Sequence, residues 1–235
     1  MRNYFTLGGT DSRTMGVYIS GQGAFSAPAR SYDFISVPNR NGDLLGIDTR
    51  LLNGTLTYPA FICTNFKSNV ADFRAFLLSQ TGWMRLEDTY NPDEYRMVVY
   101  QGPFEPNVTT INDAGSFDIT FTCKPQRFLK SGETATTFTA NGTISNPTKF
   151  SAQPLIRVYG TGNVGIGSTT ITISSADTYT DIDCEMMDCF KGSTSKNQYV
   201  SFSGNDFPVL NSGSNGVTLG TGITKVEITP RWWTV

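Results

Sequence analysis

A chain of 235 residues with a formal net charge of -2 and 16% charged residues can bury one large core or two small ones without metal or disulfide support. Its Lys and Arg residues form no basic cluster, so we expect no sequence-specific nucleic-acid binding. No apolar run is long enough to span a bilayer and the first residues form no secretion signal, so we expect no membrane insertion and no signal-directed export.

The first predicted elements are short strands separated by turns. Residues 15–19 are typical of a strand. Asn41-Gly42 predicts a tight turn between two extended segments. Residues 55–63 also have a strand pattern, in which Pro59 favours an edge position or a bulge because proline cannot donate a ladder hydrogen bond.

A single stretch of the chain has apolar residues at helical spacing. Val70, Phe73 and Leu77 fall on one face, which predicts an α-helix over residues 69–79. Asn69 can cap its first turn, and Gly82 can end it in a left-handed conformation. Because so short a helix gains most of its stability by burying its apolar face, we expect it to pack against a sheet.

Alternating strands follow the helix. Residues 83–88 and 94–100 flank a turn and predict a hairpin. Residues 117–124 place Phe117, Ile119, Phe121 and Cys123 on one face and polar residues on the other, so one face belongs to a core.

The pattern loosens between residues 131 and 150, which we predict to be a linker between two domains. Short strands separated by turns resume from residue 151 to the end and predict a second, helix-free β-sandwich. The fold class is therefore mainly β, with two β-sandwich domains at residues 1–130 and 151–235.

The sequence contains no histidine, which excludes Ser-His and Cys-His nucleophiles. The four cysteines lack zinc-site spacing and are predicted to be free and structural. The glycine-rich residues 160–167 lack the Lys-Ser or Lys-Thr of a phosphate loop and are predicted to be a turn. We expect no catalytic residue, no cofactor and no metal.

Acidic residues gather on one segment of the second half. Asp181, Asp183 and Glu185, with Asp177 and Asp188 nearby, have a spacing that suits a carboxylate pair or a calcium site. The favoured interpretation is the solvated face of a strand, because no calcium-loop pattern accompanies them.

Three aromatic residues are candidates for stacking on a glycan or a partner. Trp232 and Trp233 stand near the end of the chain and Tyr159 lies in a predicted strand. The alternative interpretation, that the two tryptophans pack on the sandwich core or its rim, is favoured.

Taken together, these features resemble the distal tail proteins (Dit) of siphophages and prophages of Gram-positive bacteria. The resemblance covers nearly the whole chain and depends on the order and spacing of short motifs. These are Gly16-Val17, residues 37–42, the lone helix, Leu86-Glu87-Asp88 with Tyr95, residues 121–128, Asn146-Pro147, residues 154–160, Ile182-Asp183, residues 207–215 and residues 230–233.

The resemblance implies a hexameric ring at the distal end of a tail tube, with one helix in the first sandwich and a galectin-like second sandwich. It implies a non-enzymatic hub of the virion, assembled in the host cytoplasm, that joins the tail tube protein to the tail tip or baseplate. Its further partners would be a tail-associated lysin, fibre or tip protein and a receptor-binding protein. Relatives that bind saccharide carry an inserted module, and no segment here is long enough to be one.

Two other functions remain open at this point. One is a carbohydrate-binding module in the second domain, acting directly in host-surface recognition. The other is a glycosidase that uses Asp181 or Asp183, which ranks last.

Polar segments of the first domain are the predicted ring contacts. Residues 2–13 and 31–43 are too long and too hydrophilic for simple hairpin connections, so both are available to reach a neighbouring subunit. The candidate interface residues are Val37, Pro38, Asn39, Arg40, Asn41 and Gly42. We predict that a fragment ending near Lys130 forms rings and that one beginning near Asn146 is monomeric.

Overall fold

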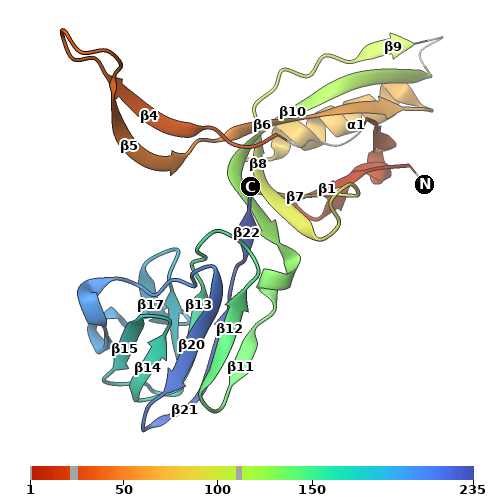
Figure 1. The fold of residues 1–235 in the computed structure, drawn as a ribbon. Helices are drawn as coiled ribbons and strands as arrows, with labels where there is room; N and C mark the ends of the chain where they lie inside the picture. Colours follow the sequence, from red (N-terminus) through yellow and green to blue (C-terminus); the bar gives the residue numbers. More distant parts are fainter. Residues whose placement is uncertain (1, 22–25, 110–112) are drawn as a thin grey trace. The chain divides into compact units, whose positions relative to one another are not determined.

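The computed structural model describes residues 2–21, 26–109 and 113–235, and it divides into two compact units (Figure 1). Unit 1 comprises Met1–Arg127 with Val235, and unit 2 comprises Phe128–Thr234. Strands dominate both units, and the described residues contain a single α-helix. The prediction of a mainly β chain with one helix is confirmed.

The elements of unit 1 are β1 (Phe5–Leu7), β2 (Thr10–Asp11), the 3-10 helix η1 (Ser12–Met15), β3 (Val17–Ile19), β4 (Arg30–Ile35), β5 (Leu44–Leu51), β6 (Gly54–Ile62), α1 (Phe66–Ser79), β7 (Met84–Asp88), β8 (Glu94–Tyr100), β9 (Asn107–Thr109) and most of β10 (Ala114–Leu129).

Unit 2 contains η2 (Lys130–Glu133), β11 (Thr136–Phe138), β12 (Gly142–Asn146), β13 (Leu155–Gly160), β14 (Gly162–Ile166), β15 (Thr169–Ile173), β16 (Thr180–Asp183), β17 (Asp188–Lys191), β18 (Thr194–Ser195), η3 (Asn197–Tyr199), β19 (Val200–Phe202), η4 (Ser203–Asn205), β20 (Gly213–Leu219), β21 (Ile223–Thr229) and β22 (Trp233–Thr234).

The main sheet of unit 1 has the strand order β2-β1-β7-β8-β10-β6-β3. β10 pairs antiparallel with β6, so that Phe117, Ile119 and Phe121 stand opposite Ala60, Tyr58 and Leu56. All six side chains are buried. The predicted alternation of residues 117–124 is therefore confirmed, and this face of the sheet forms the core of unit 1.

Helix α1 packs on that core through Phe73 and Leu77, which are both buried. It begins at Phe66, one turn before the predicted start, and Phe66 extends the same apolar stripe. Asn69 therefore lies inside the helix, and its side chain donates to the Thr64 carbonyl. The predicted cap at Asn69 is wrong.

The ends of α1 depend on residues that helical periodicity does not reveal. The Asn65 and Phe66 N–H groups donate to the side chain and the carbonyl of Asp113. At the other end Gln80 is the C-cap in an extended conformation, and Gly82 has a positive φ two residues beyond it. The predicted stop at Gly82 is therefore also wrong.

The polar opening of the chain is folded into unit 1. β1 lies between β2 and β7 in the sheet, and Phe5 and Leu7 are buried. The buried Ser12 hydroxyl donates to the Val17 carbonyl. The prediction that residues 2–13 are available to reach a neighbouring subunit is wrong, because this segment is part of the sheet and contributes Phe5 and Leu7 to the core.

The described residues of unit 2 form a pair of sheets and contain no α-helix. One has the order β11-β21-β13-β16-β17-β18 and the other the order β12-β20-β14-β15-β19. Their buried side chains, such as Ile156 and Val226 from the first sheet and Val164 and Val217 from the second, form one core. The predicted sandwich is confirmed, and its likeness to galectins stays a prediction.

Two predictions within the second half need correction. The segment 131–150 is not a linker, because β11 pairs with β21 and β12 pairs with β20. Polar residues in these strands face solvent on sheet edges, which gave the segment its loop-like composition. Residues 162–166 of the predicted glycine-rich turn form β14, which pairs with β15 and β20.

Candidate subunit interface

The hairpin β4–β5 is a separate two-stranded sheet of unit 1. Ile35 stands opposite Leu44, Phe34 opposite Leu45 and Asp33 opposite Gly46. Among the described strands, β4 and β5 pair only with each other. A lone two-stranded hairpin is marginally stable in water, so this element needs a further surface to pack against.

The end of this hairpin next to its loop carries exposed apolar side chains on both faces. Phe34 is 70% exposed and Leu45 is 51% exposed, and the two share one face because they are cross-strand partners. Ile35 and Leu44, also exposed, lie on the opposite face because successive strand residues alternate. Tyr32 adds a third exposed side chain to the face of Phe34. Exposed apolar side chains gathered on one element mark an interaction surface.

The predicted interface residues lie in the loop between these strands. All of Val37, Pro38, Asn39, Arg40, Asn41 and Gly42 fall between Ile35 and Leu44, and all but the half-buried Val37 are exposed. The connection spans residues 36–43, so the predicted two-residue turn at Asn41-Gly42 is wrong.

The loop carries its own turn within this connection. The Arg40 N–H donates to the Val37 carbonyl at 3.2 Å. Asn39 and Gly42 have φ values of 62° and 79°, in the left-handed region that asparagine and glycine tolerate. These contacts shape a defined hairpin tip, which we name the arm tip (residues 37–42).

Sequence reasoning proposed the residues of the arm tip as interface residues, which stays a prediction, and it missed the apolar strands beside them. The signal was present in the adjacent apolar pairs Phe34-Ile35 and Leu44-Leu45, which place an apolar side chain on each face. Such a two-sided pattern is typical of a strand covered on both faces. In the structure the hairpin has that pattern, but among the described residues neither face is covered.

The predicted stacking aromatics do not form one site. Trp232 is 5% exposed and belongs to the core of unit 2, so it is ruled out as a candidate for stacking on a glycan. Trp233 stacks on Phe150 with ring centroids 4.5 Å apart, and its Nε1 donates to the Ser151 carbonyl. The favoured interpretation of both tryptophans as packing residues agrees with these contacts.

Tyr159 lies far along β13 from the two tryptophans. It pairs with Lys225, whereas the tryptophans follow Thr229 at the other end of β21. The Lys225 Nζ lies 4.0 Å from the centroid of the Tyr159 ring. The Tyr159 hydroxyl donates to Glu227 Oε2 at 3.1 Å. The ring of Tyr159 is therefore engaged by side chains of its own sheet.

The acidic cluster is resolved into separate ion pairs. Arg157 donates to both carboxylate oxygens of Asp181, at 2.6 and 2.8 Å. Arg231 does the same to Asp183, at 2.7 and 2.8 Å, and this contact lowers the pKa of the Asp183 carboxyl. Asp177 is paired with Lys196.

The interpretation of these acids as a solvated strand face is wrong for Asp181 and Asp183, whereas Asp177 and Glu185 are exposed. Asp181 and Asp183 are each 4% exposed. Within the described part of the chain, no three His, Cys, Asp or Glu residues are placed to hold a metal ion. Asp177, Asp181 and Asp183 therefore form ion pairs with Arg and Lys side chains of unit 2.

The four cysteines are free, as predicted. Cys184 and Cys189 are buried, and burial raises the pKa of each thiol to about 12. Thiols with such a pKa stay protonated near neutral pH and are poor nucleophiles. The described residues also include no helix long and apolar enough to cross a membrane.

The full length of the chain aligns with the crystal structure of the SPP1 Dit protein (gp 19.1). The alignment covers 100% of both chains, with a TM-score of 0.77 and 12% sequence identity. The chain has the Dit fold. The SPP1 protein is described as a paradigm of the hub adsorption apparatus in phages that infect Gram-positive bacteria.

A second solved structure, the phage p2 baseplate in its activated conformation with Sr, aligns over 96% of this chain and 97% of that chain. Its TM-score is 0.49 and its sequence identity is 12%, so the fold assignment depends on SPP1 Dit alone. No family model and no curated protein matches the chain.

Proposed function

We propose that this chain is a structural hub protein of a phage tail. Six copies form a ring at the distal end of the tail tube and join the tube protein to the tail tip or baseplate. The ring acts as a platform for a tail-associated lysin, fibre or tip protein and for a receptor-binding protein. The protein is a virion component that is assembled in the host cytoplasm. The Dit fold over the whole chain supports this role.

The observation that carries the proposal is the β4–β5 hairpin. Its two apolar faces have no cover within the described part of the chain, and a partner would remove Phe34, Ile35 and Leu45 from water. Closed rings arise when one surface of a subunit meets a different surface of the next. A projecting element that needs a cover suits such a head-to-tail contact, whose standard size is about 800 Å² per partner.

The test is the mass of the full chain in solution, measured by mass photometry over a concentration series. The wild type is expected to form a particle of six times the 25.7 kDa chain mass. The double variant Phe34→Gln/Leu45→Gln is expected to shift the population to monomers, because it removes the apolar side chains that the neighbour would cover.

The matched control is Leu78→Gln on α1. Leu78 is 64% exposed, close to the 70% of Phe34, but it lies outside the hairpin. Its variant is expected to keep the wild-type mass. A wild type that stays monomeric at every concentration, also after a tail-tube or tail-tip protein is added, would refute the ring.

A further inference from the structure

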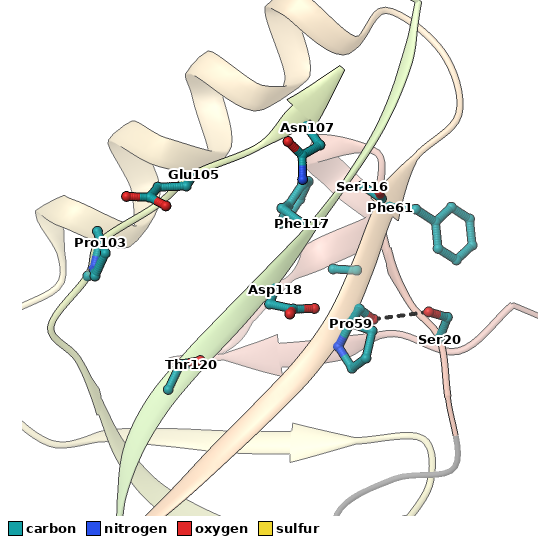
Figure 2. Close-up of a pocket in the computed structure, with 12 residues that line it drawn as sticks. Ser20, Pro59, Phe61, Pro103, Glu105, Asn107, Ser116, Phe117, Asp118 and Thr120 are labelled. Carbon is teal, nitrogen blue, oxygen red and sulfur yellow. Dashed lines mark hydrogen bonds between the residues drawn. The ribbon is translucent and has the colours of Figure 1, made fainter. Parts of the chain in front are cut away.

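Unit 1 contains a cavity of about 660 Å³ (Figure 2). One wall is the segment that precedes β9 and carries Pro103 and Glu105. The other wall is formed by β10 and β6, with the solvent-facing Asp118 of β10 and Pro59 of β6. Its volume lies in the range of sites that hold a drug-sized ligand or a few side chains. We name this cavity the socket.

The socket is acidic and partly apolar. Glu105 and Asp118 are its ionisable groups, and none of its lining residues is Lys or Arg. Both carboxylates are exposed, and neither forms an ion pair with another described residue. Pro59 and Pro103 supply apolar surface beside them. A cationic group on an apolar stem is the chemistry that complements such a site.

The arm tip carries that chemistry. Arg40 is exposed and forms no ion pair with another described residue, and Pro38 lies two residues before it. A guanidinium group can donate to two carboxylates at once and packs well on apolar surface. The arm tip is also continuous with the apolar faces of β4 and β5, which the proposed ring contact already buries.

We propose that the arm tip of a second copy of this chain enters the socket and places Arg40 against Glu105 and Asp118. This inference rests on the proposed ring and names the surface that its arm binds. The arm tip and the socket are different surfaces of one chain, so their contact is heterologous and can propagate around a closed ring. Phe34 and Leu45 then lie at the mouth of the socket, where the neighbour shields them.

The first test uses full-length variants in a dilution series followed by mass photometry. Glu105→Gln/Asp118→Asn keeps side-chain shape and removes both charges, and Arg40→Glu reverses the charge of the arm tip. Each is expected to raise the concentration of half-dissociation at least about tenfold, as for the loss of a close interfacial charge pair. Asp72→Asn, at an exposed carboxylate of α1, is the matched control and is expected to leave it unchanged.

A charge swap distinguishes a direct contact from a general effect of charge. Arg40→Glu combined with Glu105→Lys/Asp118→Lys is expected to restore the half-dissociation concentration to within about threefold of the wild type. A swapped chain that dissociates as readily as Arg40→Glu alone would overturn the contact.

The second test maps the contact and does not require a stable socket variant. A photo-cross-linking amino acid replaces Arg40, and mass spectrometry identifies the attached residue of the other copy. Cross-links to residues 102–107 or 116–120 support the socket. Cross-links confined to other residues, in chains that still lose their ring on Phe34→Gln/Leu45→Gln, overturn the socket and leave the proposed function standing. A chain that is monomeric throughout and yields no intermolecular cross-link overturns both.

Discussion

Replacing Asp183 by asparagine is expected to destabilise unit 2 by about 2–3 kcal/mol. The Asp183 carboxylate accepts two hydrogen bonds from Arg231 and one each from the N–H groups of Glu185 and Met186, at 3.0 and 3.1 Å. Its side chain is only 6% exposed, so the loss of its charge leaves the partly buried guanidinium of Arg231 with too few acceptors.

The magnitude follows from the exposure of the partner. Breaking a fully buried ion pair costs about 3–5 kcal/mol. The Arg231 side chain is 26% exposed, and the Glu185 carboxylate remains 3.6 Å from it, so solvent and this second acid offset part of the loss. Asparagine also retains one acceptor oxygen, which brings the expected cost to the lower end of that range or below it, about 2–3 kcal/mol.

The stabilisation that Asp183 provides is also expected to depend on pH. Arg231 lowers the pKa of Asp183 in the folded state. The stabilisation is therefore fully present above the unfolded pKa of about 3.9 and is lost as the pH falls through the lower folded value. Wild type and Asp183→Asn should differ most near neutral pH and converge in acid.

Urea unfolding followed by tryptophan fluorescence measures this effect. In a Trp83→Phe background the remaining tryptophans, Trp232 and Trp233, both report on unit 2. Asp206→Asn is the matched control, because Asp206 is exposed and its variant should change stability by less than about 0.5 kcal/mol. An Asp183→Asn variant whose stability equals that control at pH 7 would refute the reasoning.

Three further predictions concern the core of unit 1 and the division of the chain. Phe73→Ala should cost about 3–5 kcal/mol in chemical unfolding, because Phe73 is fully buried, whereas Leu78→Ala on the exposed face of α1 should cost less than about 1 kcal/mol. Gly115→Ala should cost about 1–3 kcal/mol in the same assay, because a Cβ there would lie 2.2 Å from an aromatic ring and 2.7 Å from a backbone oxygen. A fragment of residues 1–127 should form rings and a fragment of residues 128–235 should be monomeric by light scattering, and the opposite masses would assign the ring to unit 2.

Periodicity in the sequence was sufficient to predict elements that bury one face, with the pattern contained in a single stretch of residues. The alternation in β10 and the spacing of Phe73 and Leu77 in α1 reflect one face turned to a core, and both were predicted correctly. The start of α1 was not predictable in this way. It depends on Asp113, a residue 48 positions away from Asn65, whose contact exists only in the folded sheet.

The interpretation of the acidic segment was wrong for a related reason. Asp181 and Asp183 look like a solvated strand face because charged residues rarely lie buried alone. Their partners, Arg157 and Arg231, come from β13 and from the residues after β21. Only the order of strands in the sheet brings these four side chains together, and local patterns in a single sequence do not reveal that order.

The β4–β5 hairpin extends this reasoning from the chain to the assembly. In β10 the apolar face is buried, as Phe117 and Ile119 show. In the hairpin Phe34 and Ile35 are adjacent, point to opposite faces and are both exposed. Within one described chain this exposure is unfavourable, because the hydrophobic effect disfavours apolar surface in water. The unfavourable exposure disappears if the folding unit is larger than one chain. We therefore infer that the hairpin sequence encodes a contact between copies, in the same way that the α1 sequence encodes a contact within one.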